Sequence, residues 1–539
     1  MRRIVPFSLI LLASGVVAGC ANTPTPRTAP APARTPAAGK GGGARISRAP
    51  LPPVNPKLPP VPEVDGSLHI TVIYPPAGAL IGSRDSNFVF GSVGNGSAGL
   101  TINGALVPVW PNGAFMGWVA NPPVDKQSYT LIAYTAKDTV RDVHPVRTRA
   151  ALPPPSGPPR RDTVTPIRPP VVVVLRDDSL AGATDDTDQA IIGRPSPSGT
   201  YRWFLFPGTI GQMTGVFGAM AHVQLDPHQQ IWVARHDAHP ASDVSPAPVR
   251  VSLPQLLPQH DWIDLRLGVS SPPAYVVDET ERSVTLTLYN TTGVTGDTLI
   301  TSADPYLTDV RIHADASRVT YTFTCSRPVY GYLTLYQDSV MTFRLRRPPT
   351  VDTAHPLRGL TIAIDPGHPP AGATGPTGLY EADATLSVGL RVRDMLAAQG
   401  ATVVMTRTTP DPVALGDRPI IARRADVNAL VSIHLNALPD GMNPFHSNGT
   451  GTYYFHTHSQ RFATLMQQSL VPQLGLRNLG TFRENLALVR PTWMPAVLTE
   501  GVFIIMPDQE AAMRTPEYQD AYARGVVNGL ERFFATFAQ

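Results

Sequence analysis

The chain has 539 residues, more than a single ordinary domain holds, and its 58 prolines and 44 glycines indicate folded modules joined by proline-rich segments. With 44 basic and 41 acidic residues the net charge is only +3, so we expect no nucleic-acid partner bound by neutralisation of phosphates. The two cysteines, Cys20 and Cys325, lie in unrelated contexts, which excludes a disulfide scaffold.

The first 19 residues have the pattern of a secretory signal peptide. Two arginines follow Met1, and the apolar run over 4–19 is too short to span a membrane. The run ends in Val-Ala-Gly before Cys20, which resembles the bacterial lipobox. That resemblance implies lipidation of Cys20 and attachment to a membrane through the lipid anchor. Ala21 resembles the outer-membrane sorting pattern, so we expect a cell-envelope lipoprotein, on the periplasmic side of the outer membrane if the cell has two membranes. The alternative is an ordinary signal with an incidental cysteine.

Residues 20–65 are rich in Pro, Ala, Thr and Gly after the cysteine. This composition buries little apolar surface, so it predicts a semi-rigid tether long enough to carry folded domains from a membrane to the cell wall.

Three β-rich modules are expected in the middle of the chain. Residues 66–149 alternate short apolar segments with Gly, Asn and Pro turns, and FGSVGNGSAGLTINGALVPVWPNGAFMGWV resembles immunoglobulin-like modules of bacterial secreted enzymes. A Pro-rich linker over 150–170 follows, and residues 171–240, with VVVVLRDDSLAG and AHVQLDPHQQIWVARHD, resemble a Src-homology-like β barrel. Residues 245–349 end in YGYLTLYQDSVMTFRLRRPP and resemble the AMIN domains that precede cell-wall amidases, which implies binding to peptidoglycan or an envelope partner. The alternating segment VTYTFTCSR predicts that Cys325 is a buried strand residue.

The periodicity changes near residue 355. Short apolar runs then alternate with helical patterns, so the multidomain chain is expected to end in an α/β domain over 355–539, a mostly parallel sheet flanked by helices. The expected strands are 360–364, 402–406, 429–433, 450–455 and 496–499, and the expected helices are 382–399, 459–470 and 516–537.

Polar side chains follow three of these strands, at the sheet edge where ligands bind. His368 follows the first strand, His434 closes a second and Glu500 closes a third, while Glu381 begins the helix after a glycine-rich loop. Two imidazoles, a carboxylate ligand and a second carboxylate as base are the minimal set for a catalytic zinc, and nitrogen ligands favour Zn²⁺ over Mg²⁺. Taken singly, each has a plainer interpretation, such as a loop histidine or a helix-start carboxylate. Their combination favours a metal site.

Seven segments of this domain resemble zinc-dependent N-acetylmuramoyl-L-alanine amidases, in order and spacing: IAIDPGH, GLYEADATLSVGLRVRDMLAAQG, VVMTR, LGDR, ADVNALVSIHLNA, GTYYF and MPAVLTEGVFI. The resemblance implies that His368, Glu381 and His434 are the ligands of one Zn²⁺ and that Glu500 is the catalytic glutamate. Pro369-Pro370 stands where many relatives have two glycines, which leaves the loop geometry open.

Several other polar residues have more than one interpretation. Asn436 is a candidate substrate contact, and Arg483 and Arg490 either meet stem-peptide carboxylates or are solvated. His456 and His458 form a competing metal pair if they share one face of a strand, but we favour a substrate-groove or solvent role.

Two further arginines and one loop remain open in the same way. Arg407 and Arg418 form either a structural ion pair or substrate contacts. Residues 438–448 are a candidate lid or loop insertion. A protein activator is a possible partner, because cell-wall amidases that act at the septum often need one.

The function expected from these residues is peptidoglycan hydrolysis at the amide bond between N-acetylmuramic acid and L-alanine of the stem peptide. Two alternatives stay open. One is a lipid-anchored peptidoglycan-binding protein whose amidase domain is inactive, and the other is a zinc peptidase acting within the stem peptide. A serine hydrolase is disfavoured because no G-x-S-x-G occurs.

Overall fold

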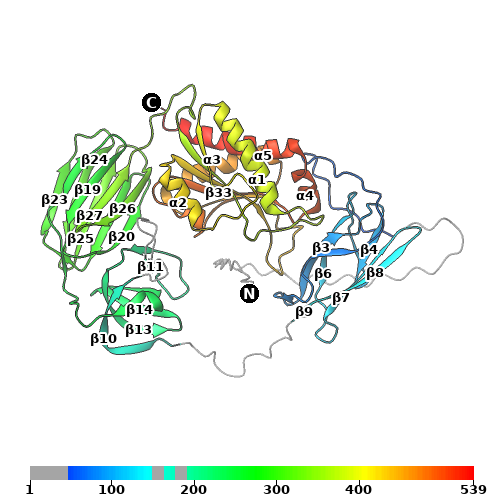
Figure 1. The fold of residues 1–539 in the computed structure, drawn as a ribbon, viewed down its shortest axis with the longest axis horizontal. Coiled ribbons are helices and arrows are strands. Elements are labelled where there is room, and N and C mark those ends of the chain that lie inside the picture. The colour runs from blue at the N-terminus through cyan, green and yellow to red at the C-terminus, as the bar shows by residue number, and fades with distance from the viewer. Residues whose placement is uncertain (1–46, 149–162, 177–190, 539) are drawn as a thin grey trace, which may run out of the picture. The chain divides into compact units, whose positions relative to one another are not determined.

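The computed structural model describes residues 47–148, 163–176 and 191–538. The predicted signal peptide, Cys20 and most of the predicted tether lie outside the described residues. From residue 47 on, the chain belongs to one compact unit with a large all-β region followed by an α/β domain (Figure 1). In the described ranges, no helix is long and apolar enough to cross a membrane.

The first module is a β-sandwich. Its strands are β1 (Thr71–Tyr74), β2 (Leu80–Ile81), β3 (Ser86–Ser92), β4 (Gly99–Ile102), β5 (Ala105–Val107), β6 (Ala114–Ala120), β7 (Ser128–Tyr134), β8 (Thr139–Pro145) and β9 (Arg147–Thr148). They form the antiparallel sheets β1-β3-β6 and β5-β4-β7-β8, with the small pair β2-β9. Successive side chains of a strand point to opposite faces, and both faces of β3 are buried. Val89 lies in the core of the sandwich, while Phe88 and Phe90 join an apolar cluster that continues into the α/β domain.

The second module comprises β10 (Thr165–Leu175), β11 (Ile191–Gly193), β12 (Trp203–Leu205), β13 (Ile210–Phe217), β14 (Met220–Asp226), β15 (Gln229–Ala234), η2 (Arg235–Asp237) and β16 (Ala238–Pro240). Its main sheet has the order β15-β14-β13-β10-β16. The predicted linker over 150–170 ends earlier than expected, because β10 begins at Thr165. The pairing of β10 with β13 shifts between Pro166 and Val171. Prolines, which lack an N–H donor, are tolerated at such an irregularity.

The third module is a second sandwich. Its strands are β17 (Val249–Arg250), β18 (Gln255–Pro258), β19 (Trp262–Gly268), β20 (Ala274–Glu279), β21 (Ser283–Tyr289), β22 (Thr291–Thr292), β23 (Gly296–Thr301), β24 (Leu307–Ala314), β25 (Arg318–Cys325), β26 (Gly331–Gln337) and β27 (Val340–Arg346). The sheets are β18-β19-β27-β26 and β20-β21-β25-β24-β23. Cys325 ends β25 and is 3% exposed, which confirms the predicted buried strand residue, and burial raises the pKa of its thiol to about 12.

The C-terminal domain is built around one six-stranded sheet. Its elements are β28 (Thr361–Pro366), α1 (Glu381–Ala398), β29 (Thr402–Met405), α2 (Asp417–Arg424), β30 (Ala429–Asn436), β31 (Thr450–Tyr454), α3 (Thr457–Leu474), β32 (Asn478–Arg483), η3 (Ala487–Val489), β33 (Ala496–Phe503), α4 (Pro507–Met513) and α5 (Pro516–Ala535). The strand order is β29-β28-β30-β33-β31-β32, and only the β31–β33 pairing is antiparallel. The expected mostly parallel α/β sheet is therefore confirmed.

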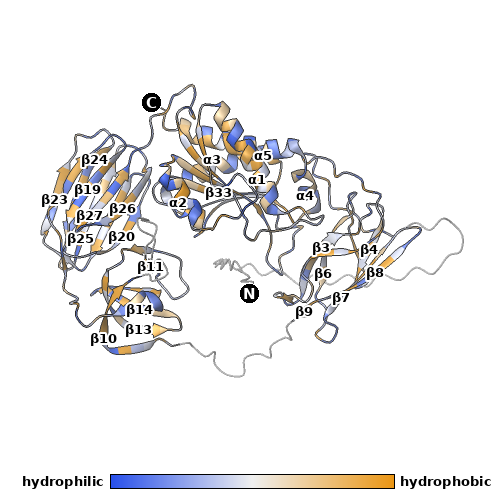
Figure 2. Cartoon of the chain, viewed as in Figure 1, coloured by the Kyte–Doolittle hydropathy of each residue, from blue (hydrophilic) through white to orange (hydrophobic). Residues whose placement is uncertain are grey.

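The two faces of this sheet are covered differently. On one face, Ile362, Ile364 and Val431 pack with buried residues of α1, α3 and α5. On the other face, Ala363 and Leu430 pack with residues of α2 and η3 and with Trp262 and Leu333 of the third module. Figure 2 shows hydrophobic residues along these strands, while α1 and α5 carry both hydrophobic and hydrophilic residues. This packing leaves the carboxyl ends of β28, β30 and β33 to carry polar side chains.

The described end of the predicted tether, residues 47–65, is packed against folded structure. Leu58 is 9% exposed within the apolar cluster of the C-terminal domain, and the Asn55 side-chain amide donates to the Gly475 carbonyl (2.9 Å). The loop after β30 is fastened in a similar way, because the Asp440 carboxylate accepts hydrogen bonds from the Tyr74 hydroxyl and the Asn87 amide of the first sandwich (2.5 and 2.7 Å).

Candidate metal centre

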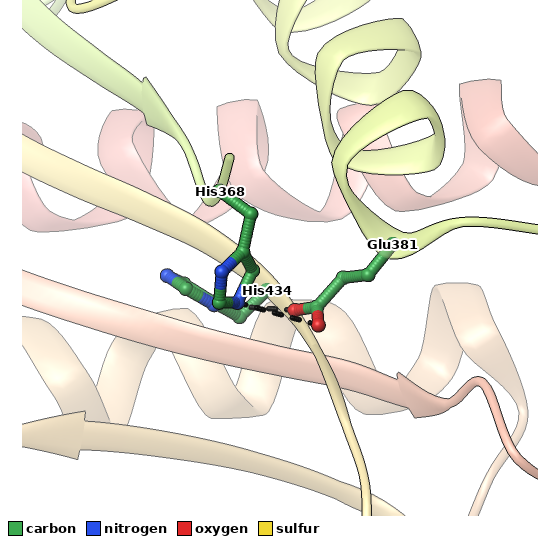
Figure 3. A group of neighbouring side chains, drawn as sticks. All are labelled: His368, Glu381 and His434. Atoms are coloured by element: carbon green, nitrogen blue, oxygen red, sulfur yellow. Dashed lines mark hydrogen bonds and ion pairs between the residues drawn. The ribbon is translucent and has the colours of Figure 1, made fainter. Parts of the chain in front are cut away.

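Three side chains from separate elements converge at the carboxyl edge of the parallel strands. His368 lies in the loop after β28, Glu381 is the first residue of α1, and His434 lies near the end of β30 (Figure 3). The two imidazole rings lie 4.9 Å apart at 81°. The rings can approach this closely because residue 367 is a glycine. A Cβ atom at that position would lie 2.4 Å from the ring of His434.

Glu381 is the centre of the group. Its Oε2 lies 3.3 Å from Nε2 of His368, and its Oε1 lies 3.2 Å from Nδ1 of His434. One donor atom from each of the three residues lies within 4.8 Å of the other two, and the described ranges contain no other group that meets this criterion. The structure thus brings together the three residues expected to ligate a metal.

The electrostatics of this group favour an ionised carboxylate. Burial acts to raise the pKa of Glu381, but hydrogen bonds and charge from the two histidines outweigh it and lower the pKa. For His368, burial acts to lower the pKa, and interaction with Glu381 outweighs it and raises the pKa. Backbone amides of Leu435 and Ala373 also donate to the two Glu381 oxygens, at 3.0 and 2.8 Å. The carboxylate is therefore held from several sides in its charged form.

Glu500 lies next to this group on the neighbouring strand. It is part of β33 rather than a residue beyond the strand, and it pairs in register with His434. Its Oε2 is buried and has no hydrogen-bond partner among the described residues. Burial, followed by repulsion from Glu381, raises the pKa of Glu500 well above its usual value. A buried carboxyl oxygen without a partner, on a residue that pairs with His434 and is repelled by Glu381, is typical of a functional group rather than a structural one.

The three candidate substrate residues are less closely connected to this centre. Asn436 ends β30, is half-buried and forms a hydrogen bond with Tyr453, whose pKa burial and the charge of Glu500 raise to about 12. Arg483 donates to the Phe455 carbonyl (2.9 Å). Arg490 donates to the Asn485 side chain at 2.8 Å and stacks over a tyrosine ring of the second module. A role in substrate binding stays a prediction for all three.

Arg407 and Arg418, for which two interpretations were open, are buried side chains rather than surface groups that could contact a substrate. They are 4% and 3% exposed, and Arg418 forms a buried ion pair with Asp365 (2.8 Å). Neither side chain lies on a solvated surface that a large substrate can reach.

The preference for a solvent or groove role of His456 and His458 is wrong. The two residues lie at the start of α3, not on one face of a strand, and are 8% and 7% exposed. Both face Glu279 of the third module, with Nδ1 of His458 2.8 Å from the carboxylate. A carboxylate 179 residues away from His458 along the chain leaves no local signal in the sequence, so this pairing could not be anticipated.

Comparisons with known proteins concern this same domain. Residues 362–532 match the family model described as N-acetylmuramoyl-L-alanine amidase. The probable cell wall amidase LytH of Staphylococcus epidermidis is 30% identical over 188 residues, or 34% of this chain, and the chain spans only 62% of the length of that relative. The uncharacterized protein YqiI of Bacillus subtilis is 32% identical over 192 residues, which cover 34% of this chain and 90% of that protein. A crystal structure of N-acetylmuramoyl-L-alanine amidase from Clostridium difficile 630 is 31% identical, covers 32% of this chain and 96% of that chain, and aligns with a TM-score of 0.31.

Proposed function

Because this chain belongs to the N-acetylmuramoyl-L-alanine amidase family, we propose that it hydrolyses peptidoglycan at the amide bond between N-acetylmuramic acid and L-alanine of the stem peptide. The observation that carries the proposal is the convergence of His368, Glu381 and His434 near Glu500, whose buried carboxyl oxygen has no hydrogen-bond partner in the described part of the chain. This arrangement provides metal ligands and a separate proton-transfer group, the combination found in metal-assisted hydrolysis.

The three ligand candidates fit a zinc ion by the chemistry of their donors. Two imidazole nitrogens and one carboxylate oxygen are a common ligand set of catalytic zinc, and one donor atom from each residue lies within 4.8 Å of the other two. His368, Glu381 and His434 would hold the ion. When bound, zinc supplies Lewis-acid activation of the amide carbonyl and of water.

Glu500 performs the proton transfers in this proposal. It takes a proton from the attacking water and gives it to the nitrogen of L-alanine as that nitrogen leaves. Its raised pKa suits both steps, because a carboxyl group that ionises closer to neutral pH is a better acid after it has acted as a base. Asn436, Arg483 and Arg490 are the proposed contacts to the glycan or stem peptide.

The wider assignment is a proposal of the same kind. We infer a lipoprotein of the cell envelope, lipidated at Cys20, anchored on the periplasmic side of the outer membrane if the cell has two membranes, and acting on the cell wall with or without a protein activator. The immunoglobulin-like, Src-homology-like and AMIN-like assignments of the β modules belong to this proposal.

The test is digestion of purified peptidoglycan with the purified protein, with and without a zinc chelator. We expect wild-type protein to release stem peptides with a free L-alanine amine, identified by mass. Glu500→Gln should keep zinc but lose cleavage, His434→Ala should lose zinc, and Glu517→Gln, an exposed carboxylate on α5, should change neither. Cleavage by Glu500→Gln at the wild-type rate would refute the assignment of the base. Binding of wild-type protein to peptidoglycan without release of fragments would favour the inactive binding protein, and fragments cut within the peptide would favour the peptidase.

A further inference from the structure

The loop that carries His368 has an unusual backbone. His368 has a φ of 58° and Ala371 a φ of 64°, both in the left-handed region that residues with a Cβ atom rarely adopt. Such a conformation persists only where surrounding structure holds it in place. The question is therefore which groups hold this loop.

Two buried guanidinium groups hold it by its carbonyl oxygens. Arg418 donates from Nη1 to Pro366 O (2.9 Å) and from Nη2 to His368 O and Pro369 O (3.0 and 2.8 Å). Arg407 donates from Nε to Pro366 O and from Nη2 to Gly367 O (2.9 and 3.0 Å). Each carbonyl oxygen from residue 366 to residue 369 thus accepts a charge-assisted hydrogen bond from an arginine.

Arg407 also connects this loop to the second ligand. The same Nη2 atom that donates to Gly367 O also donates to the carbonyl oxygen of Ala382, the residue that follows Glu381 (2.6 Å). The Thr385 hydroxyl of α1 donates to Gly367 O as well (2.7 Å). The loop of one ligand and the helix turn of another are thereby fixed relative to each other.

Burying two positively charged side chains costs free energy that a role in packing alone does not explain. Arg418 is paired with Asp365, but among the described residues Arg407 donates its hydrogen bonds to carbonyl and hydroxyl oxygens. Burial, followed by repulsion from Arg418, lowers the pKa of Arg407 to about 10. A buried cation bonded to backbone carbonyls serves geometry, because a planar guanidinium reaches several acceptors that a lysine ammonium cannot reach together.

We propose that Arg407 and Arg418 are positioning residues that hold the His368 loop in its metal-binding conformation before a metal ion binds. The inference rests on the proposed metal centre, and it assigns to these residues the preorganisation of two of the three ligands.

The test compares Arg407→Lys and Arg418→Lys with wild-type protein by zinc competition against a chelating dye. Lysine keeps the positive charge but lacks the planar guanidinium group that donates to several carbonyl oxygens at once. We therefore expect the zinc dissociation constant to rise about 10- to 100-fold, the range seen when residues that hydrogen-bond to metal ligands are replaced. Arg391→Lys is the matched control, since Arg391 also donates from two guanidinium nitrogens, to Gln519 and Asp520, but lies on the α1 face against α5. It should change zinc affinity less than about twofold. The visible spectrum of the Co²⁺-substituted variants should shift if the ligand geometry changes.

A merely structural role predicts a different result. It lowers the unfolding temperature of the metal-free variants and leaves their zinc affinity unchanged, and that outcome in both lysine variants would overturn the proposal. A measurement on wild-type protein covers variants that do not fold. The Gly367 amide, which donates to Ile433 O (2.9 Å), should be equally protected from hydrogen exchange with and without zinc. Protection that appears only with zinc would show that the metal orders the loop and would refute preorganisation.

Neither measurement uses peptidoglycan. Wild-type protein that binds zinc but leaves peptidoglycan intact would refute the proposed activity and leave the positioning role standing. Wild-type zinc affinity in both lysine variants would refute the positioning role and leave the proposed activity standing.

Discussion

Gly367→Ala is the substitution whose effect can be worked out most directly from the structure. Position 367 has an ordinary negative φ, so alanine strains no backbone there. The added Cβ atom would lie 2.4 Å from Cε1 and 2.5 Å from Nε2 of His434, whereas ordinary contact begins at 3.4 Å. The imidazole or the loop must therefore move by about 1 Å. Distances from zinc to its ligands tolerate deviations of only about 0.2 Å, so we expect this variant to bind zinc poorly.

The expected result is a zinc dissociation constant raised at least ~100-fold, the upper end of what loss of an outer partner causes, because here a ligand itself is displaced. Overpacking should lower the free energy of unfolding by about 1–3 kcal/mol. Zinc competition with a dye and thermal unfolding of the metal-free protein measure the two effects separately. Gly416→Ala is the control, since a Cβ atom there meets no atom within 4 Å. Wild-type zinc affinity in folded Gly367→Ala protein would refute the geometry of the two histidines.

Three other predictions follow from buried polar groups. Glu510 is fully buried and accepts hydrogen bonds from two backbone amides in the loop before Glu381. Glu510→Ala should therefore lower the free energy of unfolding, measured by urea denaturation, by at least about 1–3 kcal/mol. Glu517→Ala is the neutral control. Burial acts to raise the pKa of Glu279, but the charge and hydrogen bonds of two buried histidines outweigh it and lower the pKa below its ordinary value of 4.5. Its stabilising contribution is therefore complete above about pH 4.5 and is lost as the pH falls below that value, so the stability difference between wild type and Glu279→Gln should shrink there, and a difference that grows in acid would contradict the pairing. The raised pKa and burial of Cys325 predict that iodoacetamide at pH 8 labels this thiol only after unfolding, as peptide mass mapping would detect.

The parts of the C-terminal domain with strong periodicity could be predicted from the sequence. The helix expected over 382–399 is α1, Glu381–Ala398, because its apolar residues recur at helical spacing up to the glycine at 400. The histidine candidates, His368 and His434, followed from the predicted strands, since polar residues at the ends of parallel strands meet at one edge of the sheet. Short helices gave no such signal: α2 and α4, at 8 and 7 residues, each carry a proline near the start and span only about two turns.

Contacts between residues far apart in the chain could not be predicted. The sequence of α3 shows two histidines near a helix start, and only the folded chain brings Glu279 against them. The hydrogen bonds from Arg407 and Arg418 end on backbone carbonyls, which every residue possesses, so residue identity contains no information about their partners. Long-range pairing therefore limited the prediction more than local propensity did.

The attachment of Asp440 to the first sandwich has an evolutionary consequence. Its carboxylate also accepts from the Gly82 amide (2.6 Å), and the neighbouring Gly441 amide donates to Asn87 (3.2 Å), so the segment a few residues beyond His434 and the rim of the sandwich are mutually fitted. Recombination that exchanged this sandwich for another module would leave the half-buried Asp440 carboxylate without its donors. Across related genes, Asp440 and Asn87 should accordingly be conserved together or lost together. Relatives that lack the sandwich should have a different sequence in the segment around Asp440.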